Sequence, residues 1–190
     1  MTPAAVFAIG YHGCDKKVGE AAIAGKHPLP STNAYDWLGH GLYFWENDPQ
    51  RALHWAKSQR VKSPFVLGAV IRLGHSLDLI KVEHLALLQE AHDNLLANFE
   101  AIGRPDAMPK NEEGYRGDED LVKRNLDCAV INNLHAQREE QGLPPFDTVR
   151  SPFSEGKPLY EGAGIMDRTH VQICVRQPET SIIGYFRPLI

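Results

Sequence analysis

Two short motifs in this chain each combine an aromatic ring, a hydrogen-bonding side chain and a glycine. They are Tyr11-His12-Gly13 and, thirty residues later, Gly41-Leu42-Tyr43-Phe44. The apolar run 5–9 leads directly into the first motif, which predicts that His12 lies near the end of a largely buried strand. A buried imidazole needs a hydrogen-bond partner, and Gly13 leaves the backbone open to close approach by a ligand. The first motif therefore predicts a binding site at the end of a strand.

The second motif predicts a strand with one nearly bare face. Gly39, Gly41 and Tyr43 alternate along it, so they share one side of the strand. A single phenol ring then projects beside two glycines, and a flat heteroaromatic ligand fits such a slot. Phe44 and Trp45 are interpreted as core aromatics on opposite faces.

These motifs, and the predicted helix 48–56 that follows them, resemble the ADP-ribosyltransferase superfamily, in the branch of diphtheria toxin and the poly(ADP-ribose) polymerases. The resemblance covers the first seventy residues and the final strands. It implies that NAD is the substrate, with His12 bonding a ribose hydroxyl and the Gly13 backbone holding the nicotinamide carboxamide. It also implies that Tyr43 lines the nicotinamide pocket. Arg51 is a candidate for contact with the pyrophosphate, although a surface arginine is the more common reading.

Two positions depart from the family pattern. Gln172, in the predicted strand 171–175, stands where the family usually has its catalytic glutamate, and His54 stands where a second aromatic usually stacks on nicotinamide. Strand alternation places Gln172 on a polar face that would line the cleft. Cleavage of the nicotinamide bond develops an oxocarbenium ion, which a carboxylate ~4 Å away stabilises by roughly 4 kcal/mol at an effective dielectric of about 20. Glutamine lacks that charge but can hold the ribose hydroxyls, so the expected catalytic residues are His12, Tyr43 and Gln172.

The alternative for Gln172 is a polar edge-strand residue that faces solvent. If a base is needed, Glu155 and Glu161 are the nearest candidates, in the loop 151–167 before the strand that carries Gln172. A solvated loop glutamate is the favoured interpretation for each of them. The same stretch contains side chains that could contact an acceptor: Arg150, Phe153, Lys157 and Tyr160.

Composition bounds the class of protein. The chain has 190 residues, 43% of them hydrophobic and 23% charged, as in an ordinary globular domain. Its net charge of −4 argues against nucleic-acid binding through a broad basic surface. No apolar run is long enough to cross a membrane and the N-terminus lacks a signal peptide, so we expect a cytoplasmic protein without membrane contact. The three cysteines are isolated and the nine histidines show no metal-ligand spacing, so no metal is expected.

The pattern of elements predicts one domain, residues 1–190, of the α+β class, with a helical insertion at about 82–142. Predicted strands lie at 5–13, 39–45, 65–73, 171–175 and 182–186, and predicted helices at 16–26, 48–60, 82–102 and 119–140. The stretch 142–168 reads as a loop rich in glycine and proline. By resemblance, the fold is an ADP-ribosyltransferase-like split fold of two packed, mainly antiparallel β-sheets with surrounding helices, and NAD lies in the cleft between them.

The function that the resemblance implies is mono-ADP-ribosyl transfer from NAD to a macromolecular acceptor, with release of nicotinamide. A protein acceptor is favoured over a nucleic acid because of the acidic net charge. Small enzymes of this type often act as bacterial toxins or effectors, which implies a possible antitoxin or immunity protein as partner. Two alternatives remain open: an NAD glycohydrolase, and an inactive module that binds NAD or ADP-ribose, which the missing glutamate makes credible.

Overall fold

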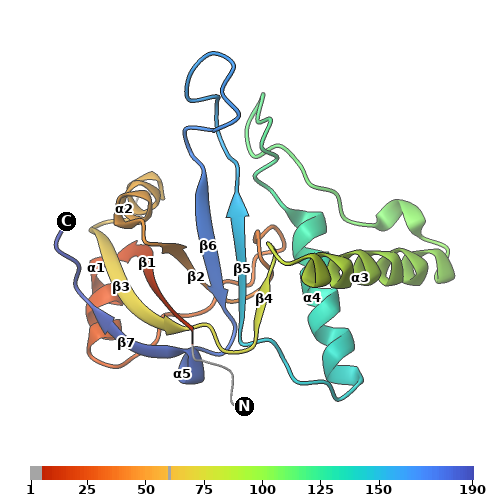
Figure 1. The fold of residues 1–190 in the computed structure, drawn as a ribbon, viewed down its shortest axis with the longest axis horizontal. Helices are drawn as coiled ribbons and strands as arrows, with labels where there is room; N and C mark the ends of the chain where they lie inside the picture. Colours follow the sequence, from red (N-terminus) through yellow and green to blue (C-terminus); the bar gives the residue numbers. More distant parts are fainter. Residues whose placement is uncertain (1–5, 60) are drawn as a thin grey trace.

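The structure, a computed structural model, describes residues 6–59 and 61–190. Its seven strands form one sheet in the order β4-β5-β6-β2-β1-β3-β7 (Figure 1). The strands are β1 (Phe7–Asp15), β2 (Leu42–Glu46), β3 (Pro64–Arg72), β4 (Ser76–Asp78), β5 (Thr148–Phe153), β6 (His170–Val175) and β7 (Ile182–Phe186). The helices are α1 (Lys16–Ile23), α2 (Pro49–Ser58), α3 (Val82–Ala101), α4 (Asn125–Glu140) and α5 (Pro178–Ser181), with a short 3₁₀ turn η1 (Pro105–Ala107).

The sheet has two halves, β4-β5-β6-β2 and β1-β3-β7, which meet where β2 pairs with β1. β1 pairs with β3 along its whole length, but its register with β2 covers only Gly10 and Tyr11. Buried apolar side chains from both halves, among them Ile71 of β3 and Phe44 of β2, form a single core cluster. An alanine Cβ at Gly10 would lie 2.6 Å from Ile71 and 2.7 Å from Phe44, so the two halves approach closely at this point. Side chains from the two halves therefore meet over Gly10 and share one core cluster.

The predicted α+β class is confirmed, but the sheet differs in two respects from the prediction. The sequence predicts two sheets, whereas the strands form one mixed sheet in which only β4 and β5 are parallel. Strand β5 falls within the stretch 142–168 that the sequence predicts to be a loop. Its core residue Val149 is fully buried between neighbouring strands. Pro152 and the flanking glycines concealed this strand, because proline is usually read as a strand breaker.

Helix α2 has the predicted start. The Asp48 carboxylate accepts a hydrogen bond from the Arg51 backbone N–H at 2.9 Å, and Pro49 occupies the first turn. The helix ends at Ser58. Two limits of the predicted elements, Ala5 of the first strand and Arg60 of this helix, lie outside the described residues.

Helix α4 begins at Asn125 rather than at the predicted Glu119. The Asp118 carboxylate accepts backbone N–H bonds from Gly114 and Val122, both at 2.9 Å, and folds this stretch into a loop instead of a helix. Leu121, predicted to be on the apolar stripe, has a φ of 49° and is therefore not helical.

Helices α3 and α4 connect β4 to β5 and cover the outer end of the sheet, well separated from α1 and α2 (Figure 1). Ile131 and Leu134 of α4 form a buried cluster with Val149 of β5 and Cys174 of β6. The predicted insertion 82–142 is thus the crossover that a parallel strand pair requires.

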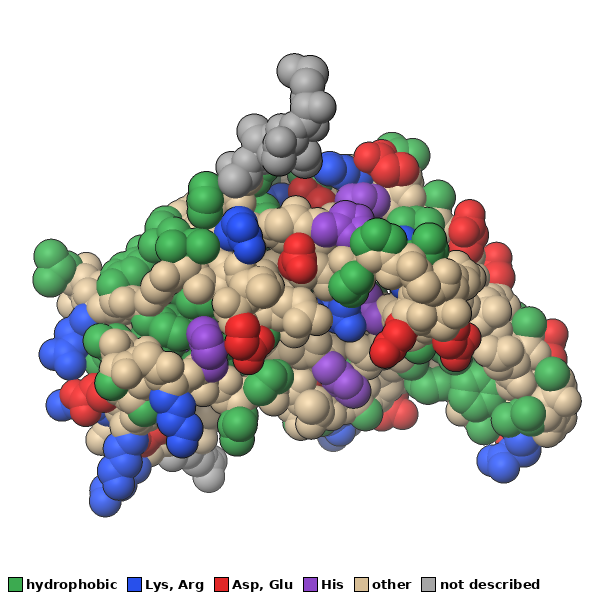
Figure 2. Space-filling view, turned by 90° about the horizontal axis from the view of Figure 1, so that it is seen from below, with side chains coloured by type: hydrophobic (Ala, Val, Ile, Leu, Met, Phe, Trp, Pro, Cys, Tyr) green, Lys and Arg blue, Asp and Glu red, His purple; other side chains and the backbone are tan. Residues whose placement is uncertain are grey.

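The charged surface is mixed. On the face shown in Figure 2, lysine and arginine side chains are interspersed with aspartate and glutamate. Among the described residues, every helix is too short or too polar to serve as a membrane span.

Candidate functional site

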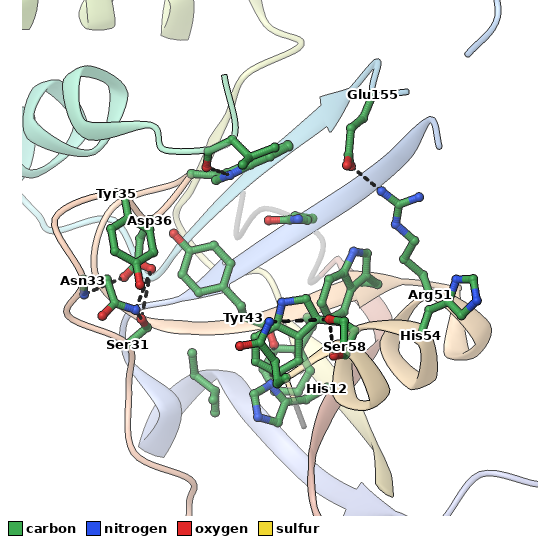
Figure 3. Close-up of a pocket in the computed structure, with 18 of the residues that line it drawn as sticks. His12, Ser31, Asn33, Tyr35, Asp36, Tyr43, Arg51, His54, Ser58 and Glu155 are labelled. Atoms are coloured by element: carbon green, nitrogen blue, oxygen red, sulfur yellow. Dashed lines mark hydrogen bonds and ion pairs between the residues drawn. The ribbon is translucent and has the colours of Figure 1, made fainter. Parts of the chain in front are cut away.

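A cavity of about 1240 Å³ opens on the face of the sheet between α2 and the loop that precedes β2. Five of the six predicted site residues line it: His12, Tyr43, Arg51, His54 and Gln172. In Figure 3, Arg51, His54 and Glu155 lie on one side of the cavity, Ser31, Asn33, Tyr35 and Asp36 on the other, and Tyr43 and His12 between them. Residues from β1, β2, α2 and β6 are thus brought together.

His12 is held by the backbone of the neighbouring strand. Its Nδ1 lies 2.8 Å from the Tyr43 carbonyl oxygen, and since a carbonyl only accepts, Nδ1 carries the proton. Burial lowers the pKa of His12, which keeps the ring neutral near pH 7. In this tautomer Nε2 is an acceptor, suited to a hydroxyl group of a ligand.

Tyr43 offers its ring to the cavity and uses its hydroxyl for structure. The hydroxyl donates to the Gly39 carbonyl at 2.6 Å and accepts from the Leu38 backbone N–H at 2.8 Å. Burial raises the pKa of Tyr43 far above its usual range. The phenol therefore fixes the turn before β2 and cannot act as an acid or base near neutral pH.

Gly39 and Gly41 allow neighbouring elements to pack closely, a role that the sequence did not predict. Gly39 has a φ of 76° and precedes the strand, and a Cβ there would lie 2.9 Å from Ile131 of α4. A Cβ at Gly41 would lie 2.4 Å from the Cys174 sulfur. The predicted alternation of three residues on one strand face is wrong for Gly39, because β2 begins only at Leu42 and Gly39 does not line the cavity. Gly41 does line the cavity beside Tyr43.

Gly13 does not line the cavity, but its backbone faces the gap between the sheet halves. A Cβ at Gly13 would lie 2.2 Å from the Ala52 carbonyl oxygen, so the glycine lets α2 pack on β1. The Asn47 N–H donates to the Ile9 carbonyl at 2.9 Å, so the backbone C=O of Ile9 is directed toward the side of β1 on which β2 lies. Backbone polar groups alternate between the two sides of a strand, so those of Gly13 face the same side as those of Ile9. Gly13 lies beyond Tyr11, the last residue of β1 that pairs with β2. Its N–H and C=O are therefore directed at the place where the two strands separate.

Gln172 lies on β6, opposite Trp45 of β2 and Ser151 of β5. It is a central residue of the sheet, so the alternative of an edge-strand residue is wrong. Its amide Nε2 lies 3.0 Å from Nε2 of His170, which is buried beside it. The amide is thus oriented by a second side chain that the sequence did not single out.

Glu155 lines the cavity, as do the carboxylates of Asp36 and Asp167. It is only 8% exposed, so the favoured interpretation of a solvated loop glutamate is wrong for it, whereas Glu161 is exposed and lies outside the cavity. Glu155 forms an ion pair with Arg51 and a second one with Arg168 at 2.9 Å. Burial raises the pKa of Glu155 and outweighs the two arginines, which act in the opposite direction.

The two predicted cofactor residues of α2 have different environments. Arg51 is turned toward Glu155, so its guanidinium is engaged within the protein (Figure 3). His54 is exposed at the rim. Of the predicted acceptor contacts, Arg150 is committed to Glu46 at 2.6 Å and to Asp78, and Phe153 packs on Trp37, whereas Lys157 and Tyr160 are exposed.

The loop before β2 forms a wall of the cavity that the sequence did not reveal. Ser31 donates its hydroxyl to the Asp36 carboxylate at 3.0 Å, and the Asn33 N–H donates to the same carboxylate at 3.1 Å. Burial raises the pKa of Asp36. The sequence contains a cluster of Ser, Asn and Asp here, which typically closes turns of this kind. That pattern predicts a turn but not a ligand-binding site.

The sequence predicts no metal site, and the described residues arrange their His, Cys, Asp and Glu side chains as follows. Within them, no group of three or more His, Cys, Asp or Glu side chains is placed to hold a metal ion. The three cysteines are buried and free, and burial raises the pKa of the Cys14 thiol to about 11. Cys14 is therefore a poor nucleophile.

Comparison with known proteins identifies a relative of this chain but indicates no activity. No family model matches the chain, and no solved structure matches it. An uncharacterized protein of Methanocaldococcus jannaschii is 28% identical over 190 aligned residues, which cover 88% of this chain and 81% of the relative. Its name states no reaction, ligand or partner.

Proposed function

We propose that this protein is a mono-ADP-ribosyltransferase that cleaves NAD, releases nicotinamide and transfers ADP-ribose to a macromolecular acceptor. The observation that carries the proposal is the convergence of His12, Tyr43 and Gln172, from three different strands, on one cavity. These are the positions that resemble the family's three signatures. The short pairing of β1 with β2, which divides the strands into two groups, adds support, because the split fold of that family also has two groups of strands.

The cavity suits a ligand as large as a dinucleotide. Its volume of about 1240 Å³ exceeds the ~300–1,000 Å³ typical of small-molecule sites. In the proposed complex, the Tyr43 ring stacks on nicotinamide and the Gly13 backbone binds its carboxamide. The neutral His12 accepts a hydrogen bond from a ribose hydroxyl through Nε2. His54 contacts the cofactor from the rim, and Arg51, if released from Glu155, pairs with the pyrophosphate.

The reaction breaks the bond between ribose and nicotinamide, and nicotinamide leaves with the bonding electrons. The acceptor nucleophile then attacks the ribose carbon and loses its proton. Gln172 positions the ribose, and much of the rate comes from holding the acceptor in line. Glu155 is the candidate for proton removal, because it is the predicted acid that lines the cavity.

One alternative has a specific observation in its favour. Gln172 carries no charge, and Glu155 is already neutralised by Arg51 and Arg168. A module that binds NAD or ADP-ribose without cleaving it needs no free carboxylate beside the ribose. The uncharged Gln172 and the paired Glu155 favour this alternative. Water as acceptor, which would make the protein an NAD glycohydrolase, is the other alternative.

The test is incubation of the purified chain with NAD labelled in the adenylate half, with and without cell lysate. Free nicotinamide together with label on protein supports the transferase, and label on RNA or DNA moves the acceptor to nucleic acid. Nicotinamide release with all label in free ADP-ribose indicates a glycohydrolase. Saturable NAD binding without nicotinamide release indicates the inactive module, and the absence of binding would refute the proposal. A stoichiometric inhibitor purified from the lysate would identify an antitoxin or immunity protein.

A further inference from the structure

The surroundings of His170 determine which of its nitrogens carries the proton. Nδ1 lies 2.8 Å from the Arg168 carbonyl oxygen and 3.6 Å from a carboxylate oxygen of Glu155. The Nη2 of Arg51, which can only donate, lies farther from the same nitrogen, at 3.2 Å, and also donates to Glu155, so the closer Arg168 carbonyl decides. Since two oxygens face Nδ1 and the nearer one is a carbonyl, the proton lies on Nδ1 and Nε2 holds a lone pair.

That tautomer in turn orients the amide of Gln172. The atom facing Nε2 of His170 must be a donor, so it is the NH₂ group of Gln172, 3.0 Å away. The Gln172 carbonyl oxygen is then left as the acceptor of a side chain that lines the cavity. A carbonyl in this place accepts a hydrogen bond, whereas the reversed amide would donate one.

We propose that His170 is a positioning residue, which holds the Gln172 amide so that its carbonyl oxygen accepts a hydrogen bond from a ribose hydroxyl of the bound dinucleotide. The assignment of the ribose rests on the proposed function, while the orientation of the amide does not. His170 thus acts through Gln172 without touching the substrate. A glutamine held this way reproduces the acceptor role of a carboxylate without its charge.

Burial of the ring, more than the charges around it, favours the neutral form of His170. Arg51 of α2 and Asp48 just before it face the ring from one side, and Glu155 and Arg168 face it from the segment between β5 and β6. Burial, together with the two arginines, lowers the pKa of His170 to about 4. The lone pair on Nε2 is therefore present at neutral pH. Trp37 and Phe153 pack against the ring and hold it in place.

The first experiment reads the tautomer directly. Long-range ¹H–¹⁵N NMR of the full chain at pH 7 should show the Nδ1–H form of His170, assigned by the loss of its signals in His170→Phe. In Gln172→Glu, a variant of nearly the same size, the carboxylate has no hydrogen to donate, so His170 should become protonated at Nε2 and its pKa should rise. An Nε2–H form in the wild-type protein, or His170 signals unchanged in Gln172→Glu, would overturn the proposal.

The second experiment measures NAD turnover. His170→Phe should lower kcat/KM about tenfold, the size of one hydrogen bond, and should have no further effect in a Gln172→Ala background. The matched control is His92→Phe, on the outer part of α3, which should retain wild-type turnover. Additive effects of the two substitutions would count against the coupling of His170 to Gln172. If the wild-type chain does not consume NAD at all, the proposed function fails, and the NMR result still decides the His170–Gln172 hydrogen bond.

Discussion

The imidazole of His12 donates its Nδ1 proton to the backbone carbonyl of Tyr43, 2.8 Å away. This hydrogen bond links β1 to β2 beyond the two residue pairs that join the halves of the sheet. The motifs Tyr11-His12-Gly13 and Gly41-Leu42-Tyr43-Phe44 are therefore in direct contact. The contact involves the backbone of Tyr43 rather than its hydroxyl, so substitutions of the Tyr43 side chain should leave the orientation of His12 intact.

Gln172→Ala should abolish transfer and lower NAD turnover by about a hundredfold or more, because the ribose loses its positioning group. Nicotinamide release under saturating NAD is the measurement. Gln89→Ala, at an exposed position of α3, is the matched control and should behave as wild type. Unchanged turnover of NAD in Gln172→Ala would refute the assignment of this residue.

Glu155→Gln should destabilise the protein by about 1–2 kcal/mol, because Arg51 would lose its carboxylate in a mostly buried place, while Arg168 keeps its ion pair with Asp120. Glu161→Gln, on an exposed part of the same loop, should change stability by less than about 0.5 kcal/mol. Urea unfolding of both variants at pH 7 provides the comparison. Equal stabilities of the two variants would show that the ion pairs of Glu155 contribute nothing.

Gly13→Ala should be destabilising by about 1–3 kcal/mol, because its Cβ would meet the Ala52 carbonyl oxygen at 2.2 Å and displace α2. Displacement of α2 also moves Arg51 and His54, so ligand binding should weaken at the same time. Gly184→Ala is the control, since a Cβ there meets open space. A Gly13→Ala variant as stable as the control would contradict the close packing of α2 on β1.

His135→Leu should make the protein less sensitive to acid. His135 is buried, both ring nitrogens lack a partner among the described residues, and burial with Arg176 and Arg138 lowers its pKa to about 3. The unfolded chain binds a proton at this residue below about pH 6.5 while the folded chain does not, so stability falls as the pH drops from about 6.5 to 3. From pH 7 to pH 5 this costs about 2 kcal/mol in the wild type.

Urea unfolding at pH 7 and pH 5 measures that difference in both proteins. His170, whose pKa is about 4, titrates in the same range but is present in both, so its contribution cancels. A His135→Leu variant with the same pH dependence as the wild type would show that His135 is not buried as a neutral ring.

The residues that the sequence predicted correctly are those whose local pattern has a single structural outcome. Asp48 followed by Pro49 starts a helix in nearly any context, and the apolar run before His12 has no alternative to a strand. The cavity-lining positions of His12, Tyr43 and Gln172 were identified by resemblance to motifs. Local patterns of this kind are short and independent of distant parts of the chain.

The parts that could not be predicted depend on distant contacts. Strand β5 contains Pro152 and forms because β4 and β6 pair with it on either side. Glu155 is buried because Arg51, from a helix more than a hundred residues earlier in the chain, reaches it. His170 looked like one more polar strand residue, and its partners Arg168 and Gln172 become visible only when the side chains are placed.

The crossover through α3 and α4 limits where residues can be deleted from this chain. Val122, just before α4, lines the cavity and accepts a hydrogen bond from the Trp37 indole at 2.8 Å. Deleting the stretch 82–142 would therefore remove a side of the cavity and leave β4 without its covalent route to β5. Evolutionary change in length is better tolerated at the exposed turn between α3 and α4, where η1 lies, than in the helices themselves. A truncated chain without these helices should not be used as a minimal version of the protein.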